Sequence, residues 1–484
     1  MMRNLILLLL FALDGHWIGH YTLGGRDVFV RIENNQLMTP GRFPAGGEPE
    51  GTRVAIVERE SGRFAAGPLL FEGVARGNTI QGKVGPGSFA FERLAELDEQ
   101  MLRGFAGQYA FDERSFVDVF YLPDIRGLVA MEFPSGRVGP IEPVSAATFV
   151  RGPSLMRRYP PDARFVFAKD AVSVNGRKAT RVRYRTEEVG NGTITFPLGD
   201  GRHPAVVLIH GGGAQTRDFG WVPAFFARLG FAVLAFDKRA NWQAATFNDL
   251  ADDVLANVEL LRKRKDISSI GLYASSNGAW VAPLVAMKRP DAIAFIIARS
   301  ASGRTNRRNV IYEAETDVRA HGFGDAEVAK LRALHERDMA VVAADGAGWN
   351  DLREAFARAS AEPWFRFSRL PPQIIEWNDA NRASIERYIR DEKQSPDPAK
   401  VWARIRVPVL IQIGGADEYV PAEESARILR AALAGNKDAT VKVYANGTHP
   451  LFESGGGRVP DYAAVSRFTP GYLTDLETWI RRRR

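Results

Sequence analysis

Residues 269–280 read SIGLYASSNGAW, an apolar strand that passes through small residues into the start of a helix. A serine on so tight a strand-to-helix turn has strained backbone torsions and tolerates only small residues two positions away, such as Ala274 and Gly278. The stretch therefore matches the G-x-S-x-G nucleophile turn, with alanine at its first position, and predicts Ser276 as a nucleophile. The alternative is that Ser275 or Ser276 only caps the following helix.

Strands and helices alternate on both sides of this turn. Strands are expected at Pro204–Ile209, Phe231–Phe236, Ser269–Tyr273, Ala292–Ala298, Val407–Ile413 and Thr440–Tyr444, and helices at Val222–Leu229, Phe247–Arg264 and Ala279–Lys288. Apolar strands separated by helices predict an α/β fold, with a mostly parallel sheet flanked by helices. A helical stretch at about residues 306–400 is too long for a crossover between neighbouring strands, so it predicts a cap insertion over the carboxyl ends of the strands.

A histidine and three glycines, His210 to Gly213, follow the first of these strands. Glycines leave the backbone N–H groups open to a developing negative charge, so this turn is the expected oxyanion hole. Its donors are expected to be the amide of Gly212, with Gly213 as the alternative, and the amide of Asn277, which follows the predicted nucleophile. Gly213 and Trp280 are expected to line the substrate pocket.

The strand that begins at Val407 ends in a glycine turn that presents Asp417 at its carboxyl end. An aspartate in that position can orient a histidine, and Glu418 is the neighbouring alternative. Of the 7 histidines, His449 is the one on a post-strand loop that follows both the serine and the aspartate. The order serine, aspartate, histidine is that of the α/β-hydrolase triad, with His449 as general base and Asp417 as the carboxylate that orients it.

Residues 14–160 are expected to form a β-rich N-terminal domain, because short strands between glycine and proline turns run through them with little helical periodicity. The catalytic α/β domain is then expected over residues 161–484. Two stretches share a spacing, WIGHY at 17–21 and FAGQY at 105–109, which could mark the first strands of two related β-units. Their aromatic side chains are expected to pack in a core, with a surface platform for a sugar or polymer as the alternative.

Residues 1–13 have the features of a secretory signal peptide. The basic Arg3 precedes an apolar run from Leu5 to Leu13, which is too short to span a bilayer. The protein is therefore expected to be periplasmic or secreted, with no stable membrane insertion once the signal is removed. If the run is instead a buried first strand, a cytoplasmic protein is expected.

The composition excludes several chemistries. None of the 484 residues is a cysteine, so disulfides, thiolate nucleophiles and cysteine metal ligands are excluded. The formal charge of +7 includes the terminal run Arg481 to Arg484, and no nucleic-acid motif accompanies it, so no nucleic-acid partner is expected. No metal and no cofactor are expected, because the histidines are dispersed and no H-E-x-x-H occurs. The sequence leaves the oligomeric state open.

From residue 205 to residue 480 the chain resembles the α/β-hydrolase superfamily, especially its bacterial branch of esterases, dienelactone hydrolases and prolyl-oligopeptidase-like enzymes. FAVLAFDKR at 231–239 is similar to that branch's strand ending in Asp-Lys-Arg-Gly, and DLADDV at 249–254 is similar to its helix before the nucleophile turn. The chain departs from the branch at residues 240–242, which replace a glycine-rich turn, and at Ala279, which replaces a glycine. The resemblance implies a serine hydrolase, and these departures leave the triad residues unchanged.

Together these observations predict a serine hydrolase that cleaves a carboxylic ester of a small-molecule acyl substrate, through a Ser-His-Asp triad and an acyl-enzyme intermediate. An ester is the default substrate, because an alkoxide leaving group makes the fewest demands on the residues of the pocket. A serine peptidase of the prolyl-oligopeptidase-like branch and an acyl thioesterase are alternatives within the same chemistry. From another class, the β-rich domain could bind a polymer while the hydrolase-like half is inactive.

Overall fold

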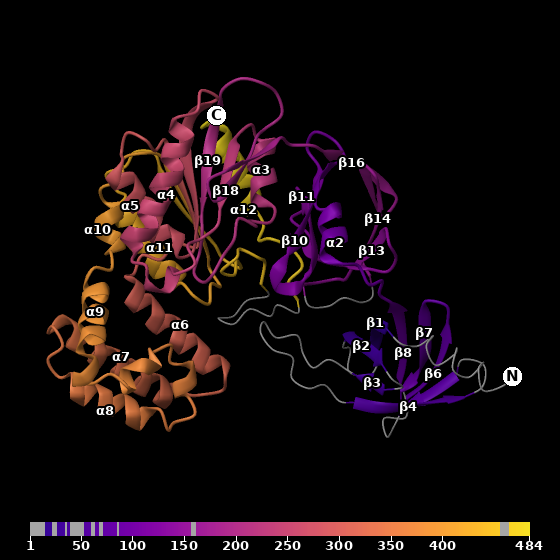
Figure 1. The fold of residues 1–484 in the computed structure, drawn as a ribbon, viewed down its shortest axis with the longest axis horizontal. Helices are drawn as coiled ribbons and strands as arrows, with labels where there is room; N and C mark the ends of the chain where they lie inside the picture. Colours follow the sequence, from indigo (N-terminus) through magenta and orange to yellow (C-terminus); the bar gives the residue numbers. More distant parts are fainter. Residues whose placement is uncertain are drawn as a thin grey trace. The chain divides into compact units, whose positions relative to one another are not determined.

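The computed structural model describes residues 15–21, 27–33, 36–38, 53–59, 63–66, 71–84, 87–155, 161–454 and 464–484. The predicted signal peptide, residues 1–13, lies outside this part of the chain. The chain divides into two compact units, Met1–Arg183 with Asp461–Arg467 and Tyr184–Pro460 with Phe468–Arg484. Figure 1 labels the helices and strands of both units.

The described residues of the first unit form two closed antiparallel barrels of eight strands each. The first comprises β1 (Gly15–Tyr21), β2 (Asp27–Glu33), β3 (Gln36–Met38), β4 (Arg53–Arg59), β5 (Arg63–Ala66), β6 (Phe71–Arg76), β7 (Thr79–Val84) and β8 (Gly87–Arg93). Strand β8 pairs with β1 and closes this barrel. Trp17 on β1 is 0% exposed, and Phe89 and Phe91 on β8 are also buried. Trp17 therefore packs in a core, as predicted, and the surface platform is wrong for this residue.

The second barrel follows helix α2 (Glu99–Phe105). It comprises β9 (Gly107–Ala110), β10 (Phe116–Leu122), β11 (Gly127–Phe133), β12 (Val138–Pro143), β13 (Thr148–Arg151), β14 (Ala163–Ala168), β15 (Ala171–Val174) and β16 (Arg177–Val182). Strand β9 pairs with both β10 and β16, which closes the barrel. Leu102 of α2 joins its core. The stretches 17–21 and 105–109 thus each lead into one barrel, which agrees with the two β-units that their shared spacing suggests.

The predicted domain boundary at residue 160 is too early. Strands β14 to β16 lie after it and complete the second barrel, and the division between the units falls after Arg183. Successive side chains of β14 alternate between buried and exposed, which is the period of a barrel strand and a signal that the prediction missed. Residues 464–467 also belong to this unit, where Arg467 forms an isolated bridge with Arg137.

The second unit is built on a sheet whose described residues form eight strands. In spatial order they are β17 (Thr186–Val189), β18 (Gly192–Thr195), β20 (Ala232–Phe236), β19 (His203–Ile209), β21 (Ile267–Ser275), β22 (Phe295–Arg299), β23 (Val409–Gly414) and β24 (Ala439–Tyr444). Strands β19 to β24 run parallel, while β17 and β18 are antiparallel at one edge. The predicted parallel sheet is confirmed, with strand ends shifted by a few residues.

Helices cover both faces of this sheet. They are α3 (Val222–Arg228), α4 (Phe247–Arg262), α5 (Gly278–Lys288), α11 (Ala422–Ala432) and α12 (Tyr472–Arg481). Figure 1 shows α4 and α5 on one face of the sheet and α3 and α12 on the other. Every residue of β23 is buried between these layers. The packed sheet therefore holds the loops at its carboxyl edge in fixed positions.

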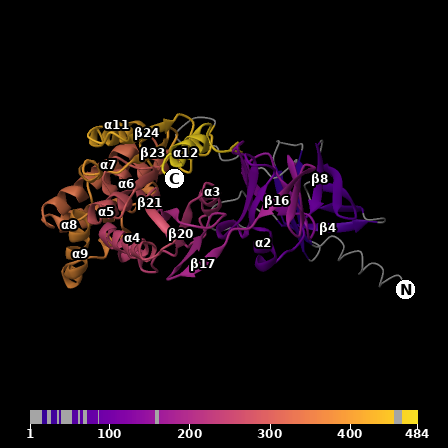
Figure 2. The ribbon, with the colours of Figure 1, turned by 90° about the horizontal axis from the view of Figure 1, so that it is seen from above.

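A helical insertion separates β22 from β23, as predicted. It comprises α6 (Asn306–Ala320), α7 (Asp325–Ala343), α8 (Trp349–Ala359), α9 (Arg382–Lys393) and α10 (Pro398–Trp402). Helices α6 to α9 lie side by side in Figures 1 and 2 and share a core of their own, in which Leu331, Leu352 and Phe356 are fully buried. In the part of the chain that the structure describes, no helix has the length and apolar character that a membrane crossing requires.

Candidate active site

Strand β21 and helix α5 present Ser276 on the turn between them. Ser276 has a φ of 52°, in the left-handed region, and its N–H donates to the carbonyl oxygen of Arg299 at 2.8 Å. A side chain at Gly278 has no room, because a Cβ there would lie 2.7 Å from the carbonyl oxygen of His210. Helix α5 has Asn277 as its N-cap residue and no hydrogen bond from a capping side chain, so the alternative in which Ser275 or Ser276 only caps the helix is wrong. A strained serine and a required glycine are the features of a nucleophile turn.

The structure brings Ser276, Asp417 and His449 together at the carboxyl edge of the sheet, although they follow three different strands. Nε2 of His449 lies 2.8 Å from Oγ of Ser276. Nδ1 of His449 lies 2.9 Å from each carboxylate oxygen of Asp417. A serine hydroxyl, an imidazole and a buried carboxylate in such a chain of hydrogen bonds can pass the hydroxyl proton to the ring.

The charges around His449 decide its pKa. Burial of the ring disfavours the charged form, but the carboxylates of Asp417 and Glu418 outweigh it, so the pKa of His449 lies above its ordinary value. The guanidinium of Arg299 acts in the opposite direction and lowers this pKa. The ring can therefore accept a proton and hold it while Asp417 stabilises the imidazolium.

Asp417 and Glu418, the two predicted alternatives, take different places. The side chain of Asp417 is buried, and its Oδ1 accepts hydrogen bonds from the backbone N–H groups of Tyr419 and Val420, at 2.8 Å each. Glu418 instead accepts the backbone N–H of His449 at 3.2 Å. The carboxylate that reaches the imidazole ring is therefore that of Asp417.

The glycine turn after β19 lies directly beside the nucleophile, because a Cβ on Gly211 would lie 3.5 Å from the Cβ of Ser276. The amide of Gly211 is occupied, since it donates to Oε1 of Gln215 at 3.2 Å. The amides of Gly212 and Asn277 donate no hydrogen bond to any residue that the structure describes. Both of the predicted donors are thus open to an anionic oxygen.

Lys238, which no sequence motif marks as a site residue, holds this glycine turn. Its Nζ donates to the carbonyl oxygens of Gly211 and Gly213, at 2.7 and 3.0 Å. The C=O and N–H of one trans peptide point in opposite directions, so the bond to the Gly211 carbonyl turns the N–H of Gly212 away from the lysine. Burial lowers the pKa of Lys238. Its position after β20, at the same edge of the sheet as the triad, was the sequence signal for it.

Helix α6 of the insertion contacts the loop that carries Asp417. The hydroxyl of Tyr312 donates to the carbonyl oxygen of Asp417 at 3.1 Å. Nδ2 of Asn309 donates to the carbonyl oxygen of Tyr419 at 3.0 Å. The ring of Tyr419 in turn packs edge-on against that of His449, with 4.8 Å between the ring centroids. The insertion is therefore attached to the loop that orients the histidine.

Two further residues singled out in the sequence are buried. The ring of His210 lies between those of Phe219 and Phe236, with centroids 4.7 and 4.9 Å away. Burial lowers the pKa of His210 to about 4, so the ring is neutral at pH 7. Trp280 is 5% exposed, and its indole N–H donates to the carbonyl oxygen of Arg304 at 3.2 Å. Its place in the substrate pocket stays a prediction.

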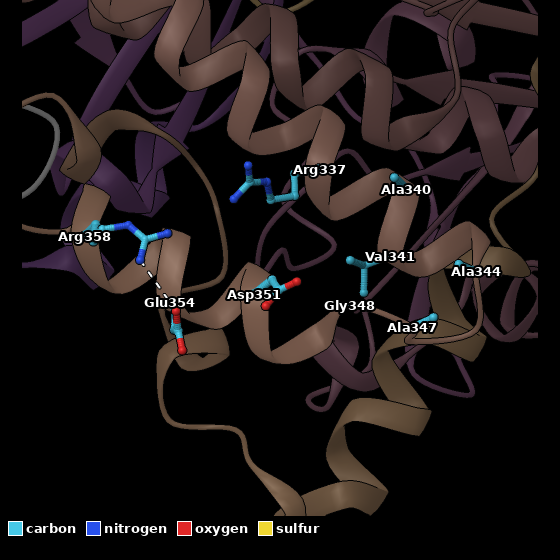
Figure 3. A pocket seen from close by; sticks show the side chains of 9 residues that line it. All are labelled: Arg337, Ala340, Val341, Ala344, Ala347, Gly348, Asp351, Glu354 and Arg358. Carbon is cyan, nitrogen blue, oxygen red and sulfur yellow. Dashed lines mark ion pairs between the residues drawn. The ribbon is translucent and has the colours of Figure 1, made fainter.

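Outside the triad there is a hollow on the insertion but no metal-binding cluster among the described residues. The hollow has a volume of about 540 Å³ and lies at helices α7 and α8, with Arg337, Asp351 and Arg358 among the charged side chains that line it (Figure 3). None of the triad residues lines it. Within the described ranges, no three histidine, aspartate or glutamate side chains are placed to hold a metal ion.

The sequence model of the alpha/beta hydrolase family matches residues 206–460, a little over half of the chain. Esterase EstD of Thermotoga maritima is 21% identical over 305 residues, which are 60% of this chain and 65%, less than two thirds, of EstD. Among solved structures, the Pyrococcus furiosus esterase Pf2001 is 16% identical, with 62% of this chain and 91% of that chain covered and a TM-score of 0.35. Dienelactone hydrolase from Anabaena variabilis is 13% identical, with 62% of this chain and 97% of that chain covered and a TM-score of 0.33. Since the family model matches more than half of its length, this chain belongs to the α/β-hydrolase family.

Proposed function

We propose that this protein is a serine esterase, with Ser276 as nucleophile, His449 as general base and Asp417 as the residue that orients the histidine. The observation that carries the proposal is the 2.8 Å separation between Nε2 of His449 and Oγ of Ser276. The left-handed φ of Ser276 supports the same role, because it is the backbone strain of a nucleophile turn. The name of the relative EstD supports an ester as the substrate.

In the proposed reaction the hydroxyl of Ser276 attacks the carbonyl carbon of the ester while His449 takes its proton. The oxyanion of the tetrahedral intermediate accepts hydrogen bonds from the amides of Gly212 and Asn277. His449 then gives the proton to the alkoxide, which leaves as an alcohol. A water molecule that loses a proton to His449 attacks the acyl group, and Ser276 regains its proton as the carboxylic acid leaves. Asp417 stabilises the imidazolium in both halves of the cycle.

Hydrolysis of short p-nitrophenyl esters by the wild type and by the Ser276→Ala variant tests the proposal. We expect kcat to fall by about 10⁴-fold or more in this variant, because the acyl-enzyme can no longer form. The matched control is Ser268→Ala, which changes an exposed serine near the start of the same strand and should keep wild-type turnover. Equal turnover by Ser276→Ala and the wild type would overturn the assignment.

The substrate class needs a second experiment, with acyl esters of graded chain length, a thioester, a lactone and an aminoacyl amide. We expect Ser276-dependent cleavage to be faster for an ester than for the amide, because an alkoxide leaves more readily than an amine. Faster Ser276-dependent cleavage of the amide would instead make the protein a peptidase, and of the thioester a thioesterase. Labelling with a fluorophosphonate, expected for the wild type and absent in Ser276→Ala, separates each of these enzymes from an inactive binding protein.

A further inference from the structure

Arg299 is the last residue of β22, which lies between the strand that leads to Ser276 and the strand that leads to Asp417. Its Nη2 and Nε donate to the hydroxyl oxygen of Ser275, at 2.6 and 3.2 Å. Its Nη1 donates to the carbonyl oxygen of Pro450 at 3.4 Å. One guanidinium therefore bonds to the residue before the proposed nucleophile and to the residue after the proposed base.

The backbone at Arg299 joins the same two segments. The carbonyl oxygen of Arg299 accepts the N–H of Ser276 at 2.8 Å. The next residue, Ser300, has a φ of 56° and donates its hydroxyl to the carbonyl oxygen of His449. Ser300 is fully buried, and a strained, buried backbone position of this kind is typical of a functional site. Side-chain and backbone bonds thus hold the serine turn and the histidine loop at a fixed separation.

The guanidinium of Arg299 brings a positive charge to this region without a carboxylate partner. Among the residues that the structure describes, no Asp or Glu side chain forms an ion pair with Arg299. Burial of this guanidinium costs free energy of desolvation, and the negative charge of Asp417 and the hydrogen bonds to neutral oxygen atoms act against that cost. An ordinary packing role gives no reason for an arginine here, because an apolar side chain would avoid that cost.

We propose that Arg299 is a positioning residue, whose guanidinium keeps the serine turn and the histidine loop in register so that Oγ of Ser276 and Nε2 of His449 meet. The inference rests on the proposed esterase function. Arg299 donates to neither of these reacting atoms, so its effect passes through Ser275 and Pro450. A shift of one ångström between two reacting groups can cost about 100-fold in rate, which is the scale of effect that such a contact can have.

The charge of Arg299 adds a second consequence that can be measured. The titratable groups that act on or contact His449 include Asp417 and Glu418, Tyr419, Arg299, and Glu313 from α6. Arg299 is the cation among them, and beside the burial of the ring it is what lowers the pKa of His449 against the two carboxylates. The acid limb of the pH profile of kcat/KM is the range in which activity rises as His449 loses its proton. Removing the charge of Arg299 should therefore shift this limb to higher pH.

The variants Arg299→Met and Arg299→Lys test the proposal, with Arg264→Met as the matched control. Arg264 is also half-buried, but it forms ion pairs with Glu187 and Asp266 at 2.6 and 2.8 Å. For Arg299→Met we expect kcat to fall about 10- to 100-fold with KM nearly unchanged, and the acid limb of kcat/KM to move to higher pH. Arg299→Lys keeps the charge but not the planar fork, so its acid limb should stay in place and its kcat should be intermediate. Arg264→Met should change neither quantity.

The proposal would be overturned if Arg299→Met kept the wild-type kcat. It would also be overturned if kcat fell only in proportion to the folded fraction measured by circular dichroism, with the acid limb of kcat/KM in place. If Arg299→Met does not fold, Ser275→Ala removes the main acceptor and leaves the charge. If Ser275→Ala then has a lower kcat and an unchanged acid limb, the result supports the positioning role. If both Ser275→Ala and Arg299→Lys keep the wild-type kcat, the result overturns it.

A wild-type protein that cleaves no ester would count against the proposed esterase function, but the rate of fluorophosphonate labelling would still measure the positioning of Ser276. A wild type that is not labelled overturns both.

Discussion

Asp417 and Glu418 are neighbours in the chain and both bind His449, but at different atoms. Asp417 accepts from Nδ1 of the ring, while Glu418 accepts from the backbone N–H. Both carboxylates raise the pKa of His449. Asp417 therefore orients the imidazole, whereas Glu418 holds the backbone of the histidine loop, and each adds a negative charge beside the ring.

Replacing Asp417 with asparagine should remove most of the activity. An amide at this position no longer stabilises the imidazolium and favours the wrong ring tautomer, so kcat for a short ester should fall by about 10³- to 10⁴-fold. Steady-state kinetics at pH 7 measure the loss, and circular dichroism checks that the fold persists. A larger loss in Glu418→Gln than in Asp417→Asn would show that the wrong carboxylate has been assigned.

The Glu418→Gln variant should stay active at lower pH than the wild type. The negative charge of Glu418 raises the pKa of His449, and the reaction needs the neutral ring, so removing the charge shifts the acid limb of kcat/KM to lower pH. Glutamine keeps an acceptor for the backbone N–H of His449. Comparison with Arg299→Met is informative because that variant should shift the limb the other way. Shifts of the same sign in both variants would contradict this electrostatic account.

Gly278→Ala should disturb the nucleophile turn. A Cβ at Gly278 would lie 2.7 Å from the carbonyl oxygen of His210 and 2.9 Å from that of Ile209, so the turn or the strand beside it has to move. We expect kcat to fall about 100-fold, because Ser276 moves with the turn. The control is Gly435→Ala, where a Cβ would meet nothing within 4 Å. Wild-type kcat in Gly278→Ala would mean that the turn yields without moving Ser276.

Lys238→Met should weaken the stabilisation of the oxyanion. Without the bonds from Nζ to the carbonyl oxygens of Gly211 and Gly213, the peptide that carries the N–H of Gly212 can turn. We expect kcat to fall about 10- to 100-fold with little change in KM, since an oxyanion donor acts mainly in the transition state. Lys288→Met is the control, because Lys288 pairs with Asp252 on the surface. An effect on KM alone would place Lys238 in substrate binding instead.

His335→Gln should reduce the acid sensitivity of the protein. His335 is 1% exposed, Nε2 lies 2.9 Å from the carbonyl oxygen of Ser368, and burial lowers its pKa to about 4. Between pH 4 and the ordinary histidine value of about 6.5 the unfolded chain binds the extra proton, so stability falls as the pH falls, by about 2 kcal/mol at pH 5. Glutamine keeps a donor but does not titrate. Thermal melts at pH 7 and pH 5 should therefore differ less in the variant, and an equal difference in both proteins would refute the assignment.

The sequence by itself determined the chemistry of the second unit. The nucleophile turn at Ser276 depends on consecutive small residues, and Asp417 and His449 each follow an apolar strand. Turn chemistry and strand periodicity are properties of chain neighbours, so they can be read without knowing the fold. Because parallel strands all end at the same edge of a sheet, the alternating pattern also placed these three residues at one edge.

Only the tertiary structure decided which neighbours each residue meets across the sheet. It distinguished Asp417 from Glu418, and it placed Lys238 on the glycine turn and Arg299 between the serine turn and the histidine loop. It also closed the two barrels and moved the boundary to Arg183. These features depend on contacts between residues far apart in the chain, and such distances are set by how the sheet and helices pack rather than by any local pattern of residues.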